Sequence, residues 1–161
     1  MATNIDEHTG KTTMGCFLVC EDVTADVTLT EDDKGDFYFY IKYSYSGMMS
    51  GSGNTNVGPL TGDTNGNYKP NDKTIISYSV TNWNLTDTEV SCNLSASIEY
   101  TGPPHMGPDS IFNNQLFSGP RRAVKLGATQ ERFEKRYAAT NEALKKASGM
   151  SVADIVAKSY K

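Results

Sequence analysis

The stretch GDFYFYIKYSYSG, residues 35–47, carries the clearest structural pattern in the chain. Its apolar side chains recur at every second position and include many aromatic rings. This period of two is typical of a β-strand with one face against a core. We expect Phe37, Phe39, Ile41, Tyr43 and Tyr45 to face the core, and Asp36, Tyr38, Tyr40, Lys42, Ser44 and Ser46 to form the other face.

Two further segments alternate in the same way. Residues 23–30 place Val, Ala, Val and Leu between Thr and Asp, and the acidic turn 31–36 should join them to the first strand as an antiparallel hairpin. In residues 85–100 the expected inward positions are Val90, Cys92, Leu94, Ala96, Ile98 and Tyr100.

Two other segments complete the β pattern, and a long loop separates some of the strands. The apolar run 15–21 suits a strand buried on both faces, and residues 74–83 form another strand. Residues 46–71 are rich in Gly, Asn, Ser and Thr and are interpreted mainly as a long loop. Five or more strands with no helix between them predict a mainly β fold, either an antiparallel β-sandwich or a barrel-like variant of it.

The chain should divide into four parts. We expect residues 1–13 to be a flexible N-terminal arm and residues 14–101 to be the β-sandwich domain. Residues 102–127 hold four of the six prolines and should be an irregular connector. Residues 128–161 predict a basic amphipathic extension of one long helix and one short helix, separated at Gly149.

The net charge of −4 conceals two segments of opposite sign. Residues 1–120 carry five Lys against fifteen Asp and Glu, whereas residues 121–161 carry ten Lys and Arg against four Asp and Glu. Such asymmetry indicates that the C-terminal segment docks on an acidic surface or binds an anionic partner.

Catalytic signatures are missing from the sequence. It has no H-E-x-x-H, G-x-S-x-G, S-x-x-K or P-loop motif, and neither His8 nor His105 has metal-ligand neighbours at a suitable spacing. The odd number of cysteines, Cys16, Cys20 and Cys92, favours three reduced core residues over a disulfide framework. We therefore expect a non-enzymatic protein without a cofactor, and an enzyme of unrecognised type is the third hypothesis.

Two candidate sites follow from residue types. The turn residues Asp32, Asp33 and Asp36 could supply oxygen ligands to calcium, although they lack EF-hand spacing and a solvated hairpin turn is favoured. Tyr38, Tyr40 and Trp83 could stack on sugar rings or lie at lipid headgroups, although cover by protein is the favoured interpretation of the two tyrosines.

The C-terminal segment supplies the third candidate surface. Its apolar stripe and basic residues should make an interaction tail, and sequence-specific nucleic-acid binding is disfavoured because the segment lacks the small residue that a helix-turn-helix needs for close packing. The residues concerned are Arg132, Phe133, Lys135, Arg136, Tyr137, Leu144 and Lys145.

These patterns lead to two main functional hypotheses. The first is a structural protein that assembles into homo-oligomers, with its basic tail docked on an acidic β domain in the same or a neighbouring copy. The second is a lectin-like, carbohydrate- or lipid-binding module that recognises a glycan or an anionic membrane. The chain shows no secretory signal pattern and no apolar run of about 20 residues, so a cytoplasmic location or a place in an assembled particle is expected.

Overall fold

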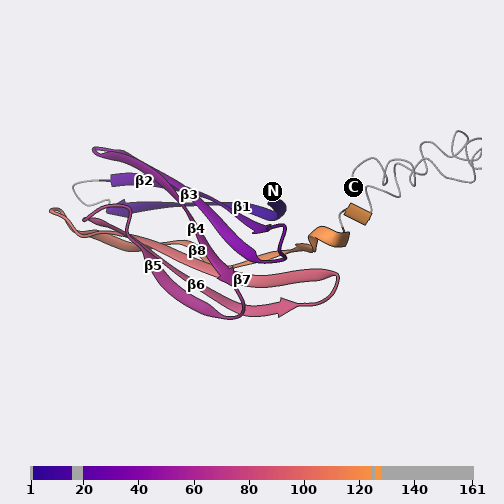
Figure 1. The fold of residues 1–161 in the computed structure, drawn as a ribbon. Helices are drawn as coiled ribbons and strands as arrows, with labels where there is room; N and C mark the ends of the chain where they lie inside the picture. The colour runs from indigo at the N-terminus through magenta and orange to yellow at the C-terminus, as the bar shows by residue number, and fades with distance from the viewer. Residues whose placement is uncertain (1, 16–19, 125, 128–161) are drawn as a thin grey trace, which may run out of the picture. The chain divides into compact units, whose positions relative to one another are not determined.

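The computed structural model describes residues 2–15, 20–124 and 126–127. Its strands form two antiparallel four-stranded sheets, which we call sheet A (order β1-β2-β3-β4) and sheet B (order β5-β6-β7-β8) (Figure 1). Neither sheet closes on itself, so the predicted mainly β fold is confirmed in its sandwich-like form. The strands are β1 (Thr3–Gly15), β2 (Cys20–Glu31), β3 (Phe37–Gly47), β4 (Ser50–Leu60), β5 (Thr64–Tyr68), β6 (Thr74–Leu85), β7 (Glu89–Tyr100) and β8 (Met106–Pro120).

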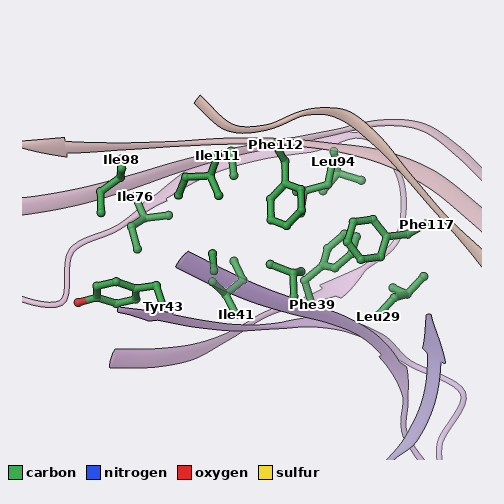
Figure 2. Close-up of a cluster of buried hydrophobic side chains, with 14 of the residues drawn as sticks. Leu29, Phe39, Ile41, Tyr43, Ile76, Leu94, Ile98, Ile111, Phe112 and Phe117 are labelled. Carbon is green, nitrogen blue, oxygen red and sulfur yellow. The ribbon is translucent and has the colours of Figure 1, made fainter. Parts of the chain in front are cut away.

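One hydrophobic core lies between the two sheets (Figure 2). At its centre the ring of Phe39 on β3 meets the ring of Phe117 on β8 edge-on, with centroids 5.0 Å apart. The inward positions predicted for β2, β3 and β7 are all buried, and β2 pairs with β3 as the expected hairpin. The alternating pattern therefore identified the central strands correctly.

Strand β1 replaces the predicted flexible arm. It pairs with β2 from Thr3 to Gly15, so the prediction for residues 1–13 is wrong. The predicted single strand over residues 15–21 is also wrong, because β1 ends at Gly15 and β2 begins opposite it at Cys20. Apart from Ile5 and Met14, the core-side positions of β1 are polar or small, so the strand shows no alternating hydrophobic pattern. These positions include Asp6, His8, Gly10 and Thr12.

Strands β4 and β5 occupy most of the predicted loop 46–71. Their inward positions include Gly51, Gly53 and Gly66, which lie opposite tyrosines of the neighbouring strands. A Cβ built on Gly53 would come within 2.8 Å of the Tyr43 ring. The tyrosine rings thus cover the glycines and supply the apolar surface that these strands lack.

Strand β8 replaces most of the predicted connector 102–127. It pairs with β7 along its length and buries Ile111, Phe112 and Phe117 in the core. Register shifts interrupt the pairing, and Asn114 has a positive φ of 52°. These irregularities and Pro108 explain why the segment lacks a strict period of two.

The prediction of three reduced core cysteines is wrong, because a disulfide bond uses two cysteines and Cys20 takes part in one. Cys20 is disulfide-bonded, whereas Cys92 is free and buried.

A second unit begins at Arg122, and its described part holds one short helix within residues 122–127. The helical extension predicted for residues 128–161 lies outside the described residues. Within the described ranges, no helix is both long enough and apolar enough to cross a membrane.

Candidate functional site

The three predicted ligand-binding residues lie on two different faces. Tyr38 and Tyr40 are half-buried on the outer face of sheet A, so they remain partly exposed. Trp83 instead packs on the core side, where its ring meets Phe37 edge-on at a centroid distance of 5.6 Å. A register shift in β6, at which Asn82 has a positive φ of 54°, accounts for this placement. The structure therefore does not bring Trp83 together with the two tyrosines.

The surroundings of Tyr40 on this outer face are polar. Tyr40 lies between Thr28 of β2 and Asn56 of β4 in the strand register. The next row places Asp26, Lys42 and Asn54 side by side, and Thr9 donates a hydrogen bond of 2.6 Å from Oγ1 to Asp26 Oδ1. A hollow adjoins these residues and is lined by Thr24, Asp26, Lys42, Ser44, Ser52 and Asn54. Carboxylate, ammonium, amide and hydroxyl groups beside an aromatic ring can hydrogen-bond and stack on a sugar.

The acidic turn between β2 and β3 is organised by Asp32. Its Oδ1 accepts the backbone N–H groups of Lys34 and Asp36, both at 2.9 Å. Such side-chain bonds to the following backbone are typical of Asp in a tight turn. Within the described part of the chain, no three His, Cys, Asp or Glu side chains are placed to hold a metal ion. Calcium binding by Asp32, Asp33 and Asp36 stays a prediction.

Arg121, the last residue of the first unit, connects this turn to sheet B. Its Nη2 lies 3.7 Å from Oε2 of the buried Glu31, and its Nη1 donates to the carbonyl of Thr86 at 3.2 Å. Its backbone N–H donates to the carbonyl of Thr88 at 2.9 Å. The guanidinium carbon also lies 5.6 Å from the centroid of the Phe37 ring, within cation–π range.

These contacts gather two acidic turns around the point where the chain leaves the sandwich. We call this region the acidic exit end. The sequence indicated only the first turn, because the second joins it through the pairing of β7 with β8 and the contacts of Arg121. Its carboxylate residues are Glu31, Asp32, Asp33 and Asp36 from the first turn, and Asp87 and Glu89 from the second.

The charge asymmetry of the sequence persists when the chain is divided at the boundary after Arg121. Residues 1–121 hold six Lys and Arg against fifteen Asp and Glu, a formal charge of −9. Residues 122–161 hold nine against four, a formal charge of +5. Opposite formal charges on the two units favour their attraction, within one chain or between chains.

A buried carboxyl group lies at the opposite end of β2. Glu21 is fully buried, and its Oε1 accepts the backbone N–H of Met49 at 2.9 Å. Its Oε2 is also buried and has no hydrogen-bond partner among the described residues. Sequence reasoning missed this residue because it treated Glu21 only as the last position of the apolar run 15–21 and gave its carboxyl group no role.

Two core groups have raised pKa values. Burial, with a smaller contribution from Asp63, raises the pKa of the Cys92 thiol to about 12. Burial also raises the pKa of Tyr43 to about 12, with the nearby Tyr68 and Tyr45 adding to the effect. A thiol with such a pKa stays protonated at neutral pH, so Cys92 is not an activated nucleophile.

The two histidines each contact a carboxylate. His8 Nε2 lies 3.1 Å from Asp6 Oδ2, and the His8 ring meets the edge of Phe117. The same Asp6 oxygen accepts the backbone N–H of Ser118 at 2.9 Å, so it ties β1 to β8. His105 Nε2 lies 2.7 Å from Glu99 Oε2 at the surface. Each histidine therefore has a neighbouring carboxylate as its partner.

The predicted interaction tail lies outside the described residues. It comprises Arg132, Phe133, Lys135, Arg136, Tyr137, Leu144 and Lys145.

Comparisons with protein-family models, with curated proteins and with solved structures find no match to this chain.

Proposed function

We propose that this chain is a non-enzymatic structural protein that self-assembles by docking its basic C-terminal segment on the acidic exit end of a sandwich. The observation that carries the proposal is that Arg121 contacts both acidic turns, at the Glu31 carboxylate in sheet A and at the Thr86 carbonyl in sheet B. The basic segment starts at the next residue. Docking at the acidic exit end relies on attraction between the basic segment and the carboxylates. A neighbouring copy carries the same carboxylates, so the segment can dock there as well.

Assembly of this kind is heterologous, because a tail on one copy meets a sandwich on the next. Such contacts build a ring where the rotation between copies closes, and a filament where it does not. Charge attraction between exposed groups is screened by salt, and the screening length falls from about 10 Å at 0.1 M to about 3 Å at 1 M. The assembly should therefore depend on ionic strength.

The native mass of the full chain at these two salt concentrations tests the proposal. Light scattering should give a mass above that of one chain at low salt and a lower mass at high salt. A single-chain mass at low salt would reject self-assembly, and an equal multimeric mass at both concentrations would reject charge as its basis.

Charge reversal locates the docking site. The double variant Asp36→Lys/Asp87→Lys changes two exposed residues of the acidic exit end and should lower the low-salt mass. The matched control Asp22→Lys/Asp72→Lys makes the same change at the opposite end of the two sheets and should leave the mass unchanged. Equal effects of the two variants would indicate a general loss of attraction and would reject the exit end as the site.

A second candidate function is carbohydrate binding on the outer face of sheet A. It is supported by the partial exposure of Tyr40 beside Asp26, Lys42, Asn54 and Asn56. The polar character of this row favours a glycan over the apolar interior of a membrane.

A glycan array and vesicle flotation distinguish these ligands. Tyr40→Ala should abolish glycan binding, whereas Ile75→Ala, which changes a half-buried residue on the outer face of sheet B, should not. Absence of glycan binding by the unmodified protein, or binding that survives Tyr40→Ala, would remove this candidate.

A further inference from the structure

Edge strands are the places where a sheet presents unpaired backbone groups to another chain. The four edges of this sandwich differ in how they are protected. Strands β1 and β8 lie against each other: Asp6 accepts the N–H of Ser118, and a Cβ on Gly10 would come within 2.8 Å of the Ile111 carbonyl oxygen. Strand β5 has five residues, too few for extensive pairing.

Strand β4 is the long edge that remains. It has eleven residues and no charged side chain, and its pairing with β3 runs without interruption from Ser50↔Ser46 to Val57↔Phe39. Natural edge strands are usually guarded by charges, bulges or short length. The strand beside it, β3, contributes one charged residue, Lys42.

One hydrogen bond shows which backbone groups of β4 point outward. The hydroxyl of Tyr68, on β5, donates to the carbonyl oxygen of Asn54 at 3.2 Å, so that carbonyl points away from β3. In an antiparallel strand the N–H and C=O of one residue point to the same side, and alternate residues share that side. Ser50, Ser52 and Asn56 should therefore also direct their backbone groups outward, and their side chains are exposed.

We propose that β4 is an assembly edge at which a second copy of this chain adds its own β4 in antiparallel orientation, so that two copies of sheet A form one continuous sheet. A two-fold axis near Gly53 would pair Ser52 with Asn54 and Ser50 with Asn56 of the other copy. Only uncharged side chains then meet across the axis, which avoids the cost of placing like charges opposite each other. Absence of charge makes β4 self-compatible, whereas β1, with Asp6, Glu7 and Lys11, would oppose like charges in some registers.

This contact is independent of the tail docking proposed above, because it uses backbone hydrogen bonds and not attraction between opposite charges. Its test is the mass of the full chain at about 1 M salt, where the screening length is about 3 Å and tail docking is weakened. We expect a concentration-dependent dimer. A single-chain mass at all concentrations under these conditions would overturn the β4 proposal and leave the tail proposal standing.

Two variants test the edge itself. Ser52→Pro removes an outward N–H without removing a hydrogen bond to β3, and Ser52→Lys adds a charge of the kind that guards natural edges. Both should abolish the high-salt dimer, and the Lys variant serves where the Pro variant does not fold. The control Ser44→Lys adds the same charge to the same face one strand inward, opposite Ser52, and should keep the dimer. A dimer that survives Ser52→Lys would overturn the proposal.

Tyr68→Phe gives a variant with the opposite expected effect. It removes the hydroxyl that donates to the Asn54 carbonyl oxygen. A backbone N–H of a second copy can then bind this oxygen without competition from Tyr68. The dimer should form at lower protein concentration, and amide hydrogen exchange in β4 should slow as concentration rises. Weaker dimerisation of Tyr68→Phe would contradict the proposed geometry.

Discussion

The ring of Tyr45 lies across Gly51 on the neighbouring strand, so close that a Cβ on this glycine would come within 2.5 Å of the phenol oxygen. The same arrangement recurs between Tyr43 and Gly53 in sheet A, and between Tyr78 and Gly66 in sheet B. In each pair an outer strand provides the glycine and the next strand provides the ring. These pairs explain how β4 and β5 hold their places with few apolar residues.

The first prediction concerns the glycine positions in β4. Gly51→Ala should lower the free energy of unfolding by about 1–3 kcal/mol, the usual cost of an added methyl group in a packed site. The Tyr45 ring, buried at 9% exposure, has little room to move aside. Urea unfolding measures the effect. Gly62→Ala is the control, because a Cβ there meets nothing within 4 Å. Equal stability of the two variants would show that the Tyr45 ring moves aside without a cost in stability.

Sequence patterns predicted only part of this fold, for physical reasons. Strands β2, β3 and β7 supply their own apolar faces, so their period of two is visible in the residues themselves. Strand β4 has its apolar cover from Tyr43 and Tyr45, which belong to another strand. No pattern confined to residues 50–60 contains that information.

The same limit applies to the candidate sites. The acidic turn 31–36 is evident in the sequence, but its connection to the second turn runs through Arg121, which contacts Glu31 and the Thr86 carbonyl. The aromatic character of Trp83 and Tyr40 predicts a shared site, and only the register shift in β6 reveals that they lie on different faces. Residue type identified candidates, whereas strand register decided which of them meet.

The second prediction concerns Arg121. Arg121→Ala should lower the free energy of unfolding by about 1–3 kcal/mol, because it removes hydrogen bonds and leaves the buried Glu31 without this counter-charge. Thermal or urea unfolding measures the change, and Lys69→Ala is the exposed control. If the ion pair matters, Glu31→Gln should recover part of the loss in the double variant. No recovery would assign the effect to the hydrogen bonds and the Phe37 contact.

The third prediction follows from the raised pKa values of Cys92 and Tyr43. Each group holds its proton more tightly in the folded protein than the ordinary pKa values of 9.0 and 10.0 allow. The resulting stability is fully present below about pH 9 and is lost as the pH rises toward about 12. Urea unfolding across this range should show falling stability. Tyr43→Phe and Cys92→Ala should each make the fall shallower, and unchanged slopes would contradict the assignment.

The fourth prediction concerns Glu21, whose Oε2 is buried without a hydrogen-bond partner among the described residues. An uncompensated buried polar atom costs about 1–3 kcal/mol. Glu21→Gln keeps an oxygen for the N–H of Met49 and removes the possibility of a buried charge, so it should be at least as stable as the unmodified protein.

Glu21→Ala separates this effect from packing. It removes the acceptor for Met49 and leaves a cavity in a fully buried site, so it should lower the free energy of unfolding by about 2–5 kcal/mol. The order of stability expected from urea unfolding is therefore Gln, Glu and then Ala. A Gln variant less stable than the unmodified protein would mean that the Glu21 carboxylate makes a favourable contact in solution. The acid itself would then stabilise this end of the sandwich.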